Sequence, residues 1–190
     1  MVTRRGALIT LGMTGAALLL PEGALASVSR ALSTRELLGA SRAVVRAEPV
    51  EAFSQWETIG DRRRIVTFTR ILVNEGVVGD AEPEILVRTL GGRVGKIGQV
   101  VHGEAALRLH EPSLLFLQDS SEGITHVTGM AQGHYRMLSD ERGAVRLRPS
   151  PRLGTLLPPA KSPAGKAAVR ELEGLTFPEA RSVILKAYQK

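Results

Sequence analysis

The stretch Arg64-Ile65-Val66-Thr67-Phe68-Thr69-Arg70-Ile71-Leu72-Val73 decides the fold of this chain. Side chains of a β-strand point alternately to its two faces, and one face of this stretch carries Ile65, Thr67, Thr69, Ile71 and Val73. Apolar residues also occupy the opposite face, at Val66, Phe68 and Leu72. The pattern predicts a long strand that is buried on both sides over part of its length.

Shorter strands are expected on both sides of this stretch, separated by turn signals such as Gly60-Asp61. They comprise residues 43–47, 50–56, 84–90, 100–101, 105–109, 113–117, 124–130, 133–138 and 144–148. The compact apolar run 113–117 is expected to be a central strand. Many short strands and turns predict a mainly β domain, a small β-barrel or a sandwich, and the single long strand favours an OB-like (oligonucleotide/oligosaccharide-binding) barrel.

A helix is expected at each end of this β domain. Residues 28–40 have helical spacing of leucines, and Ser33 with Glu36 fits a capping box. A second capping box, Thr176 with Glu179, begins a C-terminal helix over residues 176–190. The helix and β-barrel domain is therefore expected to span residues 27–148, and the Pro- and Gly-containing segment 149–175 to be an irregular linker.

Residues 1–26 are typical of a cleavable signal peptide. Arg4 and Arg5 form a basic region, residues 7–20 are apolar, and Ala24-Leu25-Ala26 supplies a small-x-small cleavage site before Ser27. The apolar run is shorter than the roughly 20 residues of a membrane span. The chain is therefore expected to be a bacterial protein exported to the periplasm or secreted.

The paired arginines also suggest a route of export. The stretch Thr3-Arg4-Arg5-Gly6-Ala7-Leu8 is similar to the twin-arginine motif, except that Ala7 stands where a Phe is usual. Export by the twin-arginine route, in which the protein folds before it crosses the membrane, is favoured slightly over the Sec route, which stays open.

The composition excludes several kinds of chemistry. The chain has no cysteine, so disulfides, thiolate catalysis and cysteine-ligated metals are excluded. The net charge of +6 is mildly basic. One Trp and two Tyr are too few for the aromatic stacking platforms of single-stranded nucleic-acid binders.

Several segments resemble a group of uncharacterised bacterial secreted proteins. The resemblance covers residues 41–148 and rests on residues 43–45, 64–69, 84–87, 91–99, 114–117 and 129–133. These proteins are similar in outline to netrin-like and TIMP-like barrels of OB type, an analogy that concerns the fold alone. The lack of every cysteine excludes the zinc-chelating mechanism of TIMP-like inhibitors.

The glycine-rich segment is the first candidate binding site. It comprises Gly91, Gly92, Arg93, Gly95, Lys96, Gly98 and Gln99. It matches neither nucleotide-binding loop pattern, although its backbone amides with Arg93 and Lys96 suit an anion. The alternative, which we favour, is that the glycines serve backbone geometry at a barrel edge.

A short basic run, Arg62, Arg63 and Arg64, follows the turn at residue 60 and is the second candidate. Three adjacent arginines suit an anionic surface, but a run this short is typical of a solvated strand entry. The single Trp56 precedes it and is either part of the core or an exposed contact residue.

No catalytic or metal signature stands out. The four histidines, His102, His110, His126 and His134, have no metal-ligand spacing and are expected to be isolated surface residues. An enzyme site of unusual kind would lie near Gln99, His102 and Glu104.

The sequence therefore predicts a non-enzymatic envelope module without metal or cofactor, which binds a protein partner through Trp56, the arginine run and residues 91–99. An envelope enzyme or enzyme subunit and a polyanion binder are the alternatives.

Overall fold

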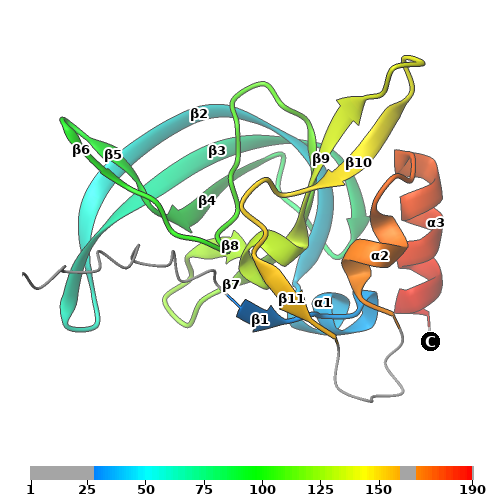
Figure 1. Cartoon of the computed structure of the whole chain (residues 1–190), viewed down its shortest axis with the longest axis horizontal. Coiled ribbons are helices and arrows are strands. Elements are labelled where there is room, and N and C mark those ends of the chain that lie inside the picture. The colour runs from blue at the N-terminus through cyan, green and yellow to red at the C-terminus, as the bar shows by residue number, and fades with distance from the viewer. Residues whose placement is uncertain (1–27, 159–165, 190) are drawn as a thin grey trace, which may run out of the picture.

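The computed structural model describes residues 28–158 and 166–189, so the expected signal peptide and its cleavage point at Ala26 and Ser27 lie outside the described residues. A long antiparallel hairpin of β2 (Ala43–Ile59) and β3 (Arg62–Val78) dominates the molecule (Figure 1). β3 contains the whole of the deciding stretch and extends it at both ends. Register shifts between residues 44 and 51 mark irregularities where the hairpin bends.

The hairpin belongs to a seven-stranded sheet that partly closes into a ring. The strand order is β10 (Val145–Pro149), β9 (His134–Ser139), β7 (Ser113–Asp119), β2, β3, β4 (Glu84–Leu90) and β8 (Thr125–Val127). β8 also pairs with β7, which links the two sides of the sheet. The prediction of a mainly β domain is thereby confirmed.

The prediction of two short strands is wrong. Residues 100–101 and 105–109 have no strand structure and form an extended connection between β6 (Ile97–Gln99) and β7. The expected bent strand over residues 124–138 is divided into β8, the short 3-10 helix η1 (Met130–Gly133) and β9. The glycines expected to bend this region lie at the two ends of η1.

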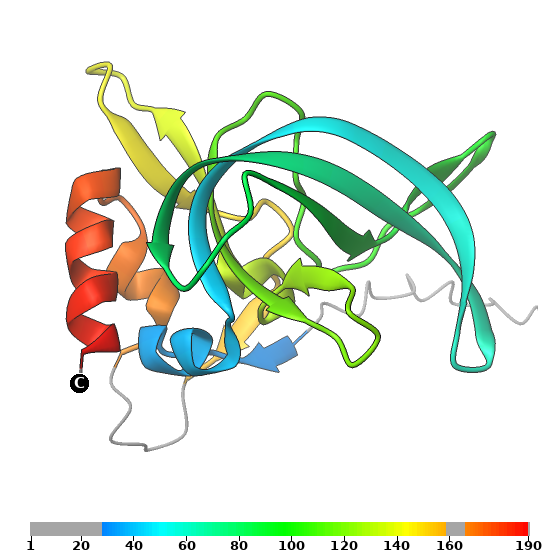
Figure 2. The ribbon, with the colours of Figure 1, turned by 180° about the vertical axis from the view of Figure 1, so that it is seen from behind.

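The helices gather on one side of the sheet. α1 (Thr34–Ala40), α2 (Ala168–Leu172) and α3 (Phe177–Tyr188) contact one another (Figures 1 and 2). Both expected capping boxes are present. The N-terminal helix, however, begins at Thr34, because residues 28–30 form β1 (Val28–Arg30), which pairs in parallel with β11 (Thr155–Leu157).

The segment 149–175 is not an irregular linker throughout. It contains β11 and α2, and α2 buries Ala168 and Leu172. Leu172 lies in a core cluster with Leu37 of α1 and Ile184 of α3. This segment therefore contributes to the core, which its Pro and Gly content did not indicate.

Candidate functional site

The turn of the long hairpin carries the predicted arginine run and Trp56. Trp56 pairs with Ile65 across the hairpin and is half-buried. The guanidinium carbon of Arg63 lies 5.2 Å from the centroid of the Trp56 ring, within range of a cation–π interaction. Arg62 and Arg63 are exposed and Arg64 is half-buried. The basic run therefore starts a strand, as expected, and its middle residue, Arg63, lies over the ring of the single tryptophan.

The glycine-rich segment forms a second hairpin, β5 (Gly92–Val94) and β6, which is fastened to the first. The Gln99 side-chain oxygen accepts a hydrogen bond from the Ile65 amide at 2.8 Å. The Gly91 amide donates to the Ile65 carbonyl at 2.8 Å, and Thr67 Oγ1 donates to the Gly91 carbonyl at 2.7 Å. These bonds place two segments about 30 residues apart in sequence side by side.

Gly92 is required for this close approach. Its φ of +133° is a conformation that side-chain-bearing residues rarely adopt. A Cβ atom at this position would also collide with the hydroxyls of Thr67 and Ser54. The backbone conformation at this position therefore requires glycine, in agreement with the interpretation of the segment that we favoured from the sequence.

The turns of the two hairpins both lie at the end of the molecule away from the helices, where they point to opposite sides (Figures 1 and 2). We call the exposed and half-buried residues at this end the distal patch; it comprises Trp56, Arg62, Arg63, Arg64, Arg93, Lys96 and Ile97. Ile97 is 57% exposed. Glu57 at this end is paired with Arg88 at 3.3 Å, and Asp61 lies 3.8 Å from Arg62. The patch is thus mainly cationic.

Gln99, His102 and Glu104, the residues of the alternative enzyme site, do not line a common cavity. Gln99 bonds the Ile65 amide, and His102 is exposed. The Glu104 carboxylate accepts hydrogen bonds from the amides of Leu90 at 3.1 Å and Ala105 at 2.9 Å. Burial raises the pKa of Glu104. Glu104 lines a cavity of about 310 Å³ with His126 rather than with Gln99 or His102.

The histidines differ from expectation in one case. His134 is fully buried, so it is not an isolated surface residue. His102 and His110 are exposed, and half-buried His126 bonds Gln118 and the Ile124 carbonyl. Within residues 28–158 and 166–189 there is no group of three or more residues placed to hold a metal ion.

A second cavity contains residues that the sequence did not single out. It is lined by Thr67, Thr69 and Thr89 and by Arg108 and Arg152. The one available signal was the pair of threonines in the otherwise apolar alternation of residues 65–73. The arginines come from segments distant in sequence, so no local pattern linked them to the threonines.

Neither a protein-family model nor a curated protein matches this chain. Among the helices that the structure describes, none combines the length and the hydrophobicity needed to cross a membrane. The argument for a function therefore rests on the residues of the site.

Proposed function

We propose that this protein is an exported, non-enzymatic binding module that docks an acidic protein surface against its distal patch. One observation carries the proposal. The β5–β6 hairpin is hydrogen-bonded to the long hairpin through Gln99 and Gly91, so the predicted basic and glycine-rich segments are held at the same end of the molecule. A surface held in place in this way loses little conformational entropy when it binds a partner.

The residue types of the patch suit a protein interface. Trp and Arg are the residues most enriched among those that dominate binding energy, and here Arg63 stacks on Trp56. Exposed Ile97 adds apolar area beside the cations. Surface cations raise the association rate with an acidic partner, which is why we assign the patch to a partner of that charge.

The arrangement of the ring supports an OB-type barrel. β2, β3, β4, β8 and β7 are paired in succession and β7 pairs again with β2, with one parallel contact between Val87 and Thr125. OB folds are five-stranded, partly open barrels in which the loop between the first two strands contacts ligands. The turn of the long hairpin has that position here. We further propose export by the signal peptide at residues 1–26.

The test begins by cross-linking the mature protein in envelope extract and identifying the partner. The affinity of the purified partner is then measured for Trp56→Ala and Arg63→Ala. Each substitution is expected to raise Kd by about tenfold or more, because hot-spot residues contribute at least about 2 kcal/mol. Gly92→Ala is expected to weaken binding too, because the added Cβ forces the β5–β6 hairpin away from Ser54 and Thr67.

Arg142→Ala is the matched control, since Arg142 is an exposed arginine in the turn between β9 and β10, outside the distal patch. It should leave Kd unchanged. The proposal fails if Trp56→Ala and Arg63→Ala bind the partner as tightly as Arg142→Ala does.

A polyanion is the second candidate, because five of the seven patch residues are Arg or Lys. The dependence of the binding constant on salt concentration distinguishes a polyanion from a protein partner. A polyanion partner would give a steep linear fall of log K with log salt, in proportion to the number of phosphates or similar groups contacted. A protein partner anchored on Trp56 would give a shallow slope.

A further inference from the structure

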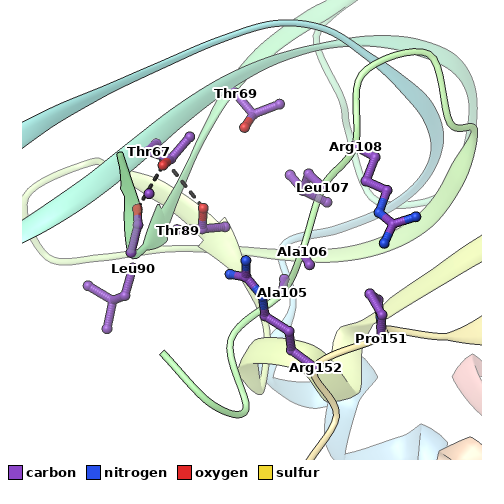
Figure 3. Close-up of a pocket in the computed structure, with 12 residues that line it drawn as sticks. Thr67, Thr69, Thr89, Leu90, Ala105, Ala106, Leu107, Arg108, Pro151 and Arg152 are labelled. Atoms are coloured by element: carbon purple, nitrogen blue, oxygen red, sulfur yellow. Dashed lines mark hydrogen bonds between the residues drawn. The ribbon is translucent and has the colours of Figure 1, made fainter. Parts of the chain in front are cut away.

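The cavity lined by threonines lies on the inner side of the bent sheet (Figure 3). Its volume is about 340 Å³, near the lower end of the roughly 300–1,000 Å³ of small-molecule sites. β3 and β4 form one side, and the extended segment 105–108 forms another. This cavity shares Gly91 and Gly92 with the base of the β5–β6 hairpin but contains none of the distal-patch residues.

The polar lining is unusual for this position in the fold. The interior of a small barrel is ordinarily filled by apolar side chains, and Ile71, Val87 and Leu115 do so in the neighbouring part of the ring. Thr67 and Thr69 interrupt that apolar row in β3. Thr89 lies directly opposite Thr67 in β4 and continues the hydroxyl-lined surface.

Thr69 has a hydroxyl without a hydrogen-bond partner among the residues that the structure describes. Its side chain is only 1% exposed. Its hydroxyl is not one of the fully buried side-chain atoms left without a partner among the described residues, so it is accessible from the cavity and can bond a polar group held there. Thr67, by contrast, already bonds Ser54 and the Gly91 carbonyl.

Two arginines complete the cavity. Figure 3 shows the side chain of Arg152 reaching toward Thr89, and Arg108 on the side away from the threonines. Neither forms an ion pair with any carboxylate in residues 28–158 and 166–189, and no acidic residue lines the cavity. Glu104, which feels the charge of Arg152, is already engaged by the amides of Leu90 and Ala105. Arg108 and Arg152 are therefore free to bind an external anion.

We propose that this cavity is a binding site for a small hydroxylated oxyanion of the sugar-phosphate or sugar-acid class. The guanidinium group of Arg152, beside Thr89, holds the anionic group, because planar guanidinium matches phosphate and carboxylate oxygens, and Arg108 adds positive charge on the far side of the cavity. The threonine hydroxyls, Thr69 above all, bond the hydroxyls of the ligand. This site is independent of the protein-binding role proposed for the distal patch.

The test is a titration of the mature protein with glucose 6-phosphate, glucuronate and glucose, followed by ¹⁵N NMR and by thermal unfolding. Glucose 6-phosphate or glucuronate is expected to shift the amide signals around Thr69, Thr89 and Arg152 and to raise Tm. The ligand that binds with the lower Kd shows whether the site prefers a phosphate or a carboxylate. Neutral glucose is expected to bind at least about tenfold more weakly, because it lacks the charge-assisted hydrogen bonds.

The double substitution Arg108→Ala/Arg152→Ala should raise Kd by at least about tenfold. Its control, Arg142→Ala/Arg148→Ala, removes the same charge from exposed positions outside the cavity and should leave Kd unchanged. Thr69→Val keeps the side-chain shape and should weaken binding without lowering Tm. The proposal is overturned if neither anion binds at millimolar concentration, if glucose binds equally well, or if both double variants bind alike.

Discussion

The buried His134 is fixed in one neutral form by a chain of hydrogen bonds. Its Nδ1 lies 3.0 Å from Ser150 Oγ and its Nε2 lies 3.2 Å from Ser113 Oγ. Ser113 donates its proton to the Glu111 carbonyl, and Ser150 accepts one from the Ala106 amide. Ser113 can then only accept from Nε2–H, which assigns the proton to Nε2, and the unprotonated Nδ1 of the neutral ring accepts from the Ser150 hydroxyl.

This arrangement predicts a loss of stability in mild acid. Burial, with a smaller contribution from the charge of Arg136, lowers the pKa of His134 to about 3, whereas an unfolded histidine has a pKa near 6.5. Between these values the unfolded chain binds a proton that the folded protein does not, so the stability present above pH 6.5 is lost as the pH falls. The free energy of unfolding should decrease by up to about 1.4 kcal/mol per pH unit, as measured by urea unfolding between pH 6.5 and pH 5.

The variant His134→Gln separates this effect from other titrations. Glutamine has no proton to gain in this range, so the variant should be less stable at pH 7 but should lose little further stability by pH 5. The three remaining histidines and the carboxylates are the same in both proteins. Equal slopes in the two proteins would show that His134 does not control the acid response.

At the scale of the element, the sequence predicted both capping boxes, although the N-terminal helix begins at Thr34 and not at residue 28. The Thr176 amide donates to the Glu179 carboxylate at 2.8 Å, and the capping box is complete. Thr176→Ala should lower the free energy of unfolding by about 1 kcal/mol, because an amide at the start of α3 loses its acceptor. Urea unfolding measures the change, with Ser182→Ala as control. Ser182 is exposed within the same helix, where alanine should be neutral or slightly stabilising, so similar losses in both variants would contradict the capping role.

The long strand was also predictable, because its alternation is a property of consecutive residues. The segment 105–109 shows why other elements were not. Its apolar residues looked like a strand, but the Ala105 amide bonds the Glu104 carboxylate and the Ala106 amide bonds Ser150 Oγ. Side-chain oxygens thus accept the backbone hydrogen bonds that a neighbouring strand would otherwise accept. The docking of the β5–β6 hairpin through Gln99 and Ile65 likewise depends on a contact across 34 residues, which local pattern does not encode.

At the scale of the whole molecule, two cores share one central layer. Leu114 and Phe116 of β7 belong to the cluster with the helices, whereas Leu115 and Leu117 belong to the cluster inside the ring. The expectation that residues 113–117 form a central strand is therefore confirmed, with both faces buried. The helices are part of the structural core because they cover one of those faces. The sequence predicted α1 and α3 but not α2, which lies in the segment expected to be an irregular linker, and the position of the helices on the sheet follows from tertiary packing.

This shared layer predicts that the C-terminal helices are needed for cooperative folding. Ending the chain at Pro158 removes Leu172, Phe177 and Ile184, which lie in one core cluster with Phe116 and Tyr135. Because Ile184→Ala alone should cost about 2–5 kcal/mol, and a domain has only about 5–15 kcal/mol to lose, the truncated chain should lose its sharp unfolding transition. Near-UV circular dichroism of Tyr135, which is 1% exposed, reports the loss in the core. Trp56 fluorescence reports the distant hairpin turn instead. A truncated chain with a native near-UV spectrum and a sharp transition would mean that the ring core folds without the helices.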